Sequence, residues 1–367
     1  MTEPGLTYAA AGVDTEAGER AVALMRESIR KAQRPETAGD FGGFAGLFDA
    51  SVLRGYRRPL LATSTDGVGT KLVIAQQMDK HDTVGIDLVA MVVDDIVVCG
   101  AEPLFLTDYI ACGRVEPTRI AAIVSGIAEG CARAGVALLG GETAEHPGVM
   151  APGDYDLAAA GTGVVEADDL LGSHRVGAGD VVIAMRSSGV HSNGFSFARA
   201  ALFDLGGLTV QSSIAELGRT VGEELLEPTA IYTKACRAVA RELSTDMHAF
   251  SHITGGGIAA NIARVLPPSL HAEIDRSTWK PHAVFDIIAG AGRAERSEME
   301  RTFNMGIGMV AVVAAAAVDN ALSVLADHGV DAWTCGVIRV RAEEDVSDSP
   351  AKGGHGGSVK VVGDYEL

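Results

Sequence analysis

The sequence predicts a globular protein of two domains that combine α-helices and β-strands. The chain has 367 residues, and a domain usually holds roughly 100–200 residues. Hydrophobic residues make up 47% of the chain, which is enough to build large buried cores. Aromatic residues are only 5% while glycine occurs 45 times, which indicates interiors of Ala, Val, Leu and Ile joined by tight turns. This composition is more typical of a globular α/β enzyme than of a fibrous or disordered chain.

The charge and the cysteines narrow the classes of protein further. A formal net charge of −18 repels nucleic acid and anionic membrane surfaces, so we expect neither as a partner. The five cysteines are scattered without a Cys-x-x-Cys pair, which indicates neither a zinc site nor a disulfide framework. The N-terminus lacks the pattern of a signal peptide, and the longest apolar run (307–318) falls short of the ~20 residues that span a bilayer. We therefore expect a cytoplasmic protein.

The first half predicts helices and strands in mixed order. Asp14 is a suitable N-cap for an amphipathic helix with Val22, Met25 and Ile29 on one face. Residues 34–46 are rich in glycine and predict a mobile loop. The further expected elements are a strand at 59–62, a helix from 72, an apolar segment at 84–98, a strand at 104–110, a helix at 117–134, and strands at 136–139 and 157–165.

A short linker at 168–173 separates the second half, which continues the mixed pattern. Its expected elements are a strand at 180–184, a polar loop at 187–194, helices at 195–204 and 228–243, a strand at 248–253, a helix at 258–266 and a strand at 308–313. Residues 343–358 are polar and rich in glycine, which predicts disorder. The expected organisation is thus a domain at 1–170, a domain at 171–342 and a disordered tail at 343–367.

The segment 64–71, Ser-Thr-Asp-Gly-Val-Gly-Thr-Lys, has the pattern of a phosphate site. It joins an apolar strand to a helix start, where free N–H groups and the positive helix end attract anions. Gly67 and Gly69 permit close backbone approach, Lys71 offers a charge, and Asp66 could hold a metal. The segment is not a Walker A loop. The alternative is a strand–turn–helix corner with a surface lysine.

An unusual series of carboxylates interrupts the apolar segment 84–98. Helical spacing places Asp87 and Asp94 on one face, with Asp95 adjacent. Carboxylates are costly to bury unless they are paired or bind a metal. Together with Asp66 and Glu142 they could supply hard oxygen ligands for Mg²⁺. The alternative is that Asp94 and Asp95 face solvent or cap another element.

Two loops of the second half contain further candidates. His191 lies in a Ser/Gly/Asn loop after a strand, where it could contact phosphate or transfer a proton, although many such histidines have no special role. Gly255, Gly257 and Ala260 fit the dinucleotide pattern Gly-x-Gly-x-x-Gly/Ala, with Asp275 near the position of a ribose-binding acid. A single match of this kind is a weak signal.

Taken in order, the segments resemble one family, the phosphoribosylformylglycinamidine cyclo-ligases, also called AIR synthetases. The resemblance spans about residues 7–340, and its motifs are highly specific in combination. The matching segments are residues 8–14 (Tyr-x-x-Ala-Gly-Val-Asp), 34–36, 65–71, 81–91, 100–105, 126–131, 140–145 (Gly-Gly-Glu-Thr-Ala-Glu), 187–194 (Ser-Ser-Gly-Val-His-Ser-Asn-Gly), 226–232, 253–257 (Ile-Thr-Gly-Gly-Gly) and 301–309 (Arg-Thr-Phe-Asn-Met-Gly-Ile-Gly-Met).

The resemblance implies a two-domain α+β fold in which N-terminal strands form a barrel with a second subunit at a homodimer interface. It also implies ATP- and Mg²⁺-dependent ring closure of formylglycinamidine ribonucleotide to 5-aminoimidazole ribonucleotide, in purine biosynthesis. The implied catalytic residues are His191, Asp66 and Lys71. The implied ATP and phosphate contacts are Asp66, Gly67, Gly69, Thr70, Lys71, Asp94, Gly141, Glu142 and Thr143. The implied substrate contacts are His191, Ser192, Asn193, Gly194, Thr254, Gly255, Gly256 and Gly257, and the implied metal ligands are Asp66, Asp94 and Asp95.

The chain departs from the family pattern in places, and other functions compete with the cyclo-ligase. The family usually has Asn-Asp at Asp94-Asp95, and the glycine-rich tail has no counterpart. The main alternative is an ATP-dependent small-molecule kinase of the same superfamily, similar to thiamine-monophosphate kinase. Segments 191–194 and 301–304 favour the cyclo-ligase. An oxidoreductase and a non-catalytic nucleotide-binding regulator are the remaining alternatives.

Overall fold

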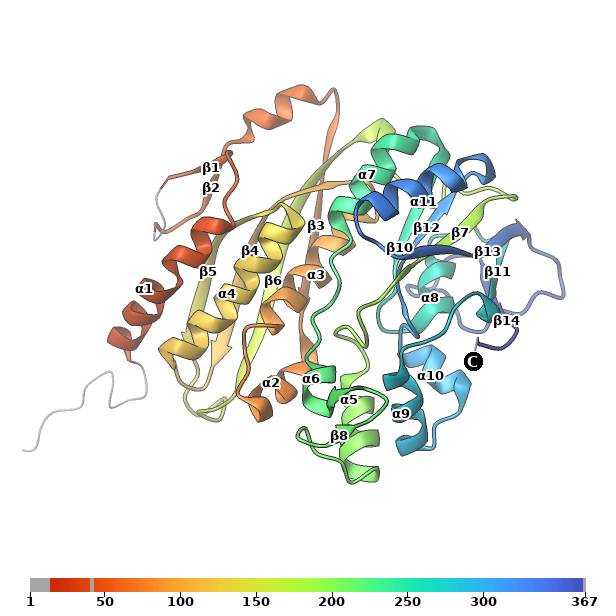
Figure 1. The fold of residues 1–367 in the computed structure, drawn as a ribbon. Coiled ribbons are helices and arrows are strands. Elements are labelled where there is room, and N and C mark those ends of the chain that lie inside the picture. Colours follow the sequence, from red (N-terminus) through yellow and green to blue (C-terminus); the bar gives the residue numbers. More distant parts are fainter. Residues whose placement is uncertain (1–13, 40–42, 366–367) are drawn as a thin grey trace, which may run out of the picture.

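Two β-sheets, one from each half of the chain, form the framework of the molecule (Figure 1). The computed structural model describes residues 14–39 and 43–365, so most of the motif at 8–14 and part of the loop at 34–46 lie outside it. The expected domain boundary falls between β6 (Tyr155–Glu166), in the first sheet, and β7 (Val181–Arg186), in the second. Asp14 caps the first helix as predicted, because its Oδ1 accepts a hydrogen bond from the Ala17 N–H at 3.0 Å.

The first sheet has four strands in the order β3-β6-β4-β5. Its other strands are β3 (Pro59–Gly67), β4 (Glu102–Cys112) and β5 (Ala137–Glu145). Helices α3 (Val84–Val97) and α4 (Pro117–Ala134) lie along one face, and α1 (Thr15–Lys31) packs on α4 (Figure 1). Within the described residues β3 and β5 have no further partner strand, so a single chain does not close the expected barrel.

The two faces of this sheet differ in burial. Leu106 and Ile110 point toward the helices and are fully buried, whereas Leu61 and Tyr109 point away and are 65% and 41% exposed. Alternation along each strand produces this difference, because successive side chains point to opposite faces. One face is therefore a core. The other carries exposed apolar side chains, and β2 (Leu47–Phe48) covers part of it, because Phe48 packs against Phe105 with ring centroids 5.2 Å apart.

The second sheet has six strands in the order β10-β12-β7-β13-β11-β14 and is covered on both faces. Met309 and Ala311 of β12 pack toward α7 and α11, whereas Val310 and Val312 pack into the core that α8 covers. Burial on both sides explains why the β12 sequence is apolar without a break. These strands are β10 (Met247–His252), β11 (Leu270–Asp275), β12 (Ile307–Val313), β13 (Ala332–Val340) and β14 (Ser358–Val362). The helices are α7 (Thr233–Leu243), α8 (Gly257–Arg264), α9 (Ala283–Gly292), α10 (Arg296–Thr302) and α11 (Val318–Asp327).

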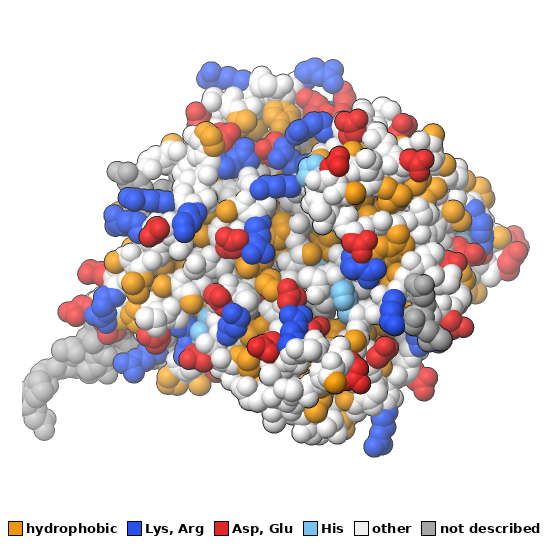
Figure 2. Space-filling view, viewed as in Figure 1, with side chains coloured by type: hydrophobic (Ala, Val, Ile, Leu, Met, Phe, Trp, Pro, Cys, Tyr) orange, Lys and Arg blue, Asp and Glu red, His pale blue; other side chains and the backbone are white. Residues whose placement is uncertain are grey.

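Short elements complete the described chain, and within it no helix is long and apolar enough to cross a membrane. They are β1 (Thr37–Ala38), β2 (Leu47–Phe48), α2 (Leu72–Met78), α5 (Phe195–Arg199), β8 (Ser213–Ile214), β9 (Arg219–Thr220) and α6 (Val221–Leu225). Acidic and basic side chains are interspersed across the face that Figure 2 shows.

The prediction of a disordered tail is wrong for its end. Strand β14 adds to the second sheet in parallel with β11, with Ser358 opposite His271. The His271 Nδ1 and Ser358 Oγ atoms lie 2.7 Å apart, and Val359 and Val361 are buried in the core. Composition suggested disorder because polar and glycine residues dominate the preceding segment, but two alternating valines suffice to dock this strand.

Candidate active site

Helix α3 lies between the two domains, and a stripe of its residues faces the second domain. Every residue of α3 except Asp95 is buried. Asp87, Met91, Asp94 and Asp95 follow the spacing of one helical face. Their hydrogen-bonding partners in the second domain include, in the same order, Thr229, Asn193, Tyr232 and His252. The costly carboxylates in this apolar segment are thus domain-joining groups.

Asp95 and His252 form the charged centre of the interdomain site. The His252 Nδ1 and Asp95 Oδ1 atoms lie 2.8 Å apart, with side chains 3% and 40% exposed. Burial lowers the pKa of His252, but the hydrogen bond to Asp95 and nearby carboxylates outweigh it, and its pKa rises above the ordinary value. Burial raises the pKa of Asp95, but His252 outweighs this and the net shift is downward. The pair therefore favours imidazolium and carboxylate.

Asp66 adds a second carboxylate to this centre. It stands near the end of β3 on the helix-covered face, and its Oδ1 accepts the Gly67 N–H at 2.7 Å. Burial raises the pKa of Asp66, and the negative charge of Asp95 raises it further. Asp66 and Asp95 are partly exposed carboxylates, and carboxylate oxygens are hard ligands that suit Mg²⁺. In the described part of the chain, however, no group of three or more His, Cys, Asp or Glu residues could hold a metal.

The two loops predicted to bind substrate meet at this site. A Cβ atom on Gly255 would lie 3.3 Å from Asn193 Oδ1, so loop 187–194 touches the turn after β10. Gly257 has φ +70°, and a Cβ there would lie 1.7 Å from Glu300 O, so only glycine fits. Thr254 Oγ1 accepts a hydrogen bond from Lys352 Nζ at 3.0 Å. These groups of the second domain lie next to His252, whose contact with the partly exposed Asp95 links them to the first domain; we call this junction the interdomain cleft.

Other predicted residues line the junction between the domains. Thr70 Oγ1 lies 3.1 Å from Ser196 Oγ, and Ser192 Oγ lies 3.1 Å from Thr229 Oγ1. Gly69 and Gly194 have φ of +71° and +79°, and a Cβ on Gly194 would clash with Phe303 at 2.4 Å. The corner at 64–71 therefore borders the second domain.

Lys71 does not offer its charge to a ligand. Its side chain is 1% exposed, and Nζ donates to Asp87 Oδ1 at 2.9 Å, His191 O at 3.1 Å and Glu227 O at 2.6 Å. An ammonium has three donors, and all three are used. Burial lowers the pKa of Lys71, and Asp87 opposes this shift. The structure makes Lys71 an interdomain clamp instead of a phosphate contact.

Asp94 is likewise committed to structure. Its oxygens accept the Tyr232 N–H at 3.2 and 3.1 Å and the Thr233 hydroxyl at 2.7 Å, which caps the start of α7. Burial raises the pKa of Asp94 to about 6. The capping alternative thus describes this residue, and Asp95 is the carboxylate that reaches the cleft. Nothing in the sequence distinguished the two adjacent residues.

The ring of His191 is also buried, 2% exposed, and does not face the cleft. Its Nε2 accepts the Ser188 N–H at 3.0 Å, while Nδ1 has no hydrogen-bond partner among the described residues. Burial, followed by the charges of His252 and Lys71, lowers its pKa well below the ordinary value. The residue has φ +65°, and its ring packs so close to Gly308 that a Cβ there would lie 2.5 Å from Cε1. These contacts describe a neutral residue that shapes the loop.

Gly141, Glu142 and Thr143 are not beside Asp66 in one chain. Asp66 pairs with Ala159 of β6, which pairs with Asp108 of β4, which pairs with Gly141. Asp66 and Gly141 therefore share one row across the sheet but stand three strand spacings apart, about 14 Å. Both strands form edges of the first sheet.

The dinucleotide hypothesis is wrong on topology. A dinucleotide fold needs adjacent parallel strands around its glycine turn. Three strands separate β10 from β11, and both pair antiparallel with their neighbours β12 and β13. Asp275 accepts hydrogen bonds from Ser277 N and Oγ at 2.9 and 2.8 Å.

Sequence reasoning missed His252 and Lys352. The position of His252 at the end of a strand, just before the Thr-Gly-Gly-Gly turn, was an available signal. The sequence contains no comparable signal for Lys352, because this residue lies in the segment expected to be disordered. Cavity size does not identify the candidate site either. Pockets of about 320 and 370 Å³ lie beside Glu102 and Arg276 respectively, and neither is lined by Asp95 or His252.

Two family models match the chain, one in each half. The family described as "AIR synthase related protein, N-terminal domain" matches residues 48–165, and its C-terminal counterpart matches residues 177–349. Among solved structures, thiamine-monophosphate kinase from Stenotrophomonas maltophilia has a TM-score of 0.65 at 17% identity, covering 92% of this chain and 95% of that one. Hydrogenase maturation protein HypE in complex with ATP has a TM-score of 0.63 at 16% identity, covering 90% and 89%. At such identities the likeness shows the fold alone.

Sequence relatives are more specific. Phosphoribosylformylglycinamidine cyclo-ligase from Trichlorobacter lovleyi is 47% identical over 92% of this chain and 96% of its own length. The enzyme of that name from Geobacillus kaustophilus is 49% identical over 90% and 95%, and that from Anaeromyxobacter dehalogenans is 50% identical over 91% and 95%. This chain belongs to the phosphoribosylformylglycinamidine cyclo-ligase family.

Proposed function

We propose that the protein catalyses ATP-dependent ring closure of formylglycinamidine ribonucleotide, releasing 5-aminoimidazole ribonucleotide, ADP and phosphate. The observation that carries this function is identity of 47–50% to cyclo-ligases across at least nine-tenths of the chain. That span includes both domains and hence both walls of the interdomain cleft. The reaction belongs to purine biosynthesis.

The chemistry suits a site that mainly aligns its reactants. An amide oxygen is a poor leaving group, so transfer of the ATP γ-phosphoryl to it forms an iminophosphate and ADP. The amidine nitrogen of the same substrate then attacks the activated carbon, the C–O bond breaks, and phosphate leaves with the former amide oxygen. Intramolecular attack benefits from a high effective molarity. The protein need only position the groups and stabilise charge.

Asp66 and Asp95 are the residues that we propose to hold Mg²⁺ with the ATP phosphates. Mg²⁺ is commonly bound by one or two carboxylates together with phosphate oxygens, which fits the two carboxylates of this cleft. The ion would neutralise charge on the transferred phosphoryl group. Gly67, Gly69 and Thr70 border the same cleft and are proposed phosphate contacts. Asn193, Thr254 and Gly255 are proposed substrate contacts from the other wall.

We propose a homodimer in which the exposed faces of two first sheets cover each other and complete a barrel. Its support is the apolar exposed face that includes Leu61 and Tyr109. Such an assembly could also bring Gly141, Glu142 and Thr143 of one subunit nearer to the other subunit's site. Light scattering at micromolar concentration should give twice the chain mass, and a monomer mass would contradict the proposal.

We also propose a cytoplasmic location. Its support is that all five cysteines are free thiols, as is usual in a reducing compartment.

The deciding experiment incubates the protein with Mg²⁺ and ATP, with and without formylglycinamidine ribonucleotide. We expect 5-aminoimidazole ribonucleotide and ADP in equal amounts only when the ribonucleotide is present. A kinase similar to thiamine-monophosphate kinase would instead phosphorylate its acceptor without closing a ring. Release of ADP in the presence of thiamine monophosphate, but not in the presence of the ribonucleotide, would favour that alternative.

A further inference from the structure

The segment 341–357, between β13 and β14, runs back over the second domain to the cleft. The matched C-terminal family domain ends at residue 349, so the later part of this segment lies beyond it. Its backbone binds helix α8 at two points: Lys352 N–H donates to Ala260 O, and Gly357 N–H donates to Ala263 O, both at 3.0 Å. The segment is therefore seated on the helix that begins at the Thr-Gly-Gly-Gly turn.

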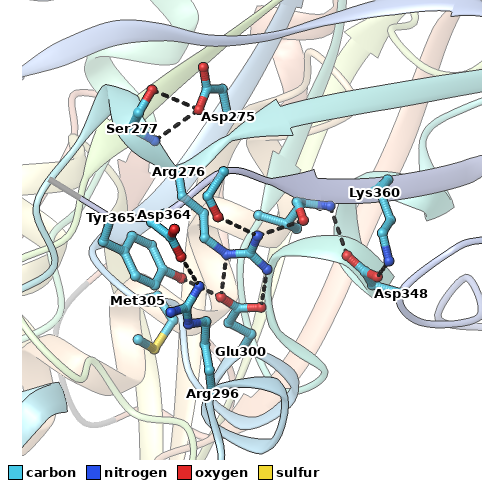
Figure 3. Close-up of polar contacts among 12 residues, drawn as sticks. Asp275, Arg276, Ser277, Arg296, Glu300, Met305, Asp348, Lys360, Asp364 and Tyr365 are labelled. Atoms are coloured by element: carbon cyan, nitrogen blue, oxygen red, sulfur yellow. Dashed lines mark hydrogen bonds and ion pairs between the residues drawn. The ribbon is translucent and has the colours of Figure 1, made fainter.

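Close packing and an ion pair hold this segment on both sides of Lys352. A Cβ on Gly356 would lie 2.1 Å from Ala263 O, so a larger residue would displace the chain. Asp348 pairs with Lys360 at 2.5 Å and accepts the Val361 N–H at 2.7 Å, which ties the segment to β14 (Figure 3). Past β14, Tyr365 donates to Glu300 at 2.8 Å, beside the Arg276–Glu300 pair in the same view. Lys352 is thus positioned by a defined path.

The side chain of Lys352 points to the candidate active site. Its Nζ donates to Thr254 Oγ1 at 3.0 Å, and within the described residues no carboxylate lies at ion-pair distance from it. Thr254 follows His252 by two residues, and His252 Nδ1 lies 2.8 Å from Asp95 Oδ1. The ammonium of Lys352 is therefore held beside the Asp95–His252 pair, and no described carboxylate neutralises it by direct contact.

We propose that Lys352 binds a phosphoryl group of a ligand in the cleft, from the ribonucleotide or from ATP. The proposal rests on the proposed function. An anionic ligand entering a protein of net charge −18 needs a local cation, and the ammonium of Lys71 is already fully used. Lys352 supplies that charge at the turn preceding α8, where backbone N–H groups also favour anions.

The test compares steady-state kinetics of Lys352→Met, Lys352→Arg and Lys31→Met with those of the wild type. Lys31 is an exposed lysine on α1, so its variant controls for the loss of one positive charge. We expect Lys352→Met to raise one KM about 10- to 100-fold, the loss of one charge-assisted hydrogen bond. Lys352→Arg should restore most of the affinity, and added salt should narrow the difference from the wild type.

The two sources of phosphoryl group are separated by which KM rises, that for the ribonucleotide or that for ATP. Wild-type values for both in Lys352→Met, with unchanged salt dependence, would overturn the proposal. An equal effect of Lys31→Met would overturn it as well, since the cause would then be general charge. Failure of the proposed function is distinguishable, because the wild type itself would then form no 5-aminoimidazole ribonucleotide.

Discussion

His252 Nδ1 lies 2.8 Å from Asp95 Oδ1, which joins the end of β10 in one domain to helix α3 in the other. The pair therefore supplies both a contact between the domains and part of the charge of the candidate site. Because the Asp95 side chain remains 40% exposed while His252 is buried, a ligand can reach the carboxylate but not the ring.

The stability supplied by this pair should depend on pH in both directions. The pKa of His252 is raised by folding, so its contribution is present at low pH and is lost as pH rises through the folded value. The pKa of Asp95 is lowered, so its contribution is lost as pH falls through the folded value. Asp95→Asn should therefore lower the melting temperature most between those two values. If the melting temperature of Asp95→Asn fell by the same amount at every pH, this account would be contradicted. As a second check, NMR titration should show a lower pKa for His252 in the variant than in the wild type.

Asp94→Asn should stabilise the protein above pH 6. The folded pKa of about 6 exceeds the usual value for aspartate, so the buried charge is penalised once the carboxyl ionises. The gain should be at most about 3 kcal/mol, since one pKa unit corresponds to 1.36 kcal/mol. It should disappear as pH falls toward 4, where the wild-type carboxyl is protonated in the folded state. Urea unfolding at several pH values measures it, and lost activity with no gain in stability would return Asp94 to the ligand-binding site.

Lys71→Met should destabilise the protein by about 3–5 kcal/mol, because it leaves Asp87 charged and buried. Urea unfolding of the single variant and of Lys71→Met/Asp87→Asn tests this, and the double variant should recover part of the loss. If Lys71→Met keeps wild-type stability but raises the KM for ATP, the phosphate role first expected for Lys71 is right and the clamp is not.

His191→Asn should affect stability more than turnover. Asparagine tolerates the left-handed backbone at this position, but the ring no longer accepts the Ser188 N–H, at a cost of about 1–3 kcal/mol. The kcat per folded molecule should stay near the wild-type value. A fall in kcat of about 10²–10⁴, with an unchanged melting temperature, would instead establish proton transfer by His191.

Local patterns in the sequence predicted helices and strands well. The helix at 117–134 and the N-cap at Asp14 follow from periodicity and capping chemistry alone. Motif resemblance led to the loops at 187–194 and 254–257, which do meet. Side-chain direction was beyond reach: Asp94 and Asp95 are adjacent in sequence, yet one caps α7 and the other faces the cleft. Lys352 could not be found because its position depends on how a polar segment docks on α8.

The most direct test of the proposed reaction follows one oxygen atom. Formylglycinamidine ribonucleotide labelled with ¹⁸O at its formyl oxygen is incubated with the protein, Mg²⁺ and ATP, and the inorganic phosphate is analysed by mass spectrometry. Activation of that oxygen by phosphoryl transfer predicts one ¹⁸O atom in each phosphate released with 5-aminoimidazole ribonucleotide. Ring closure that yields unlabelled phosphate would contradict the account.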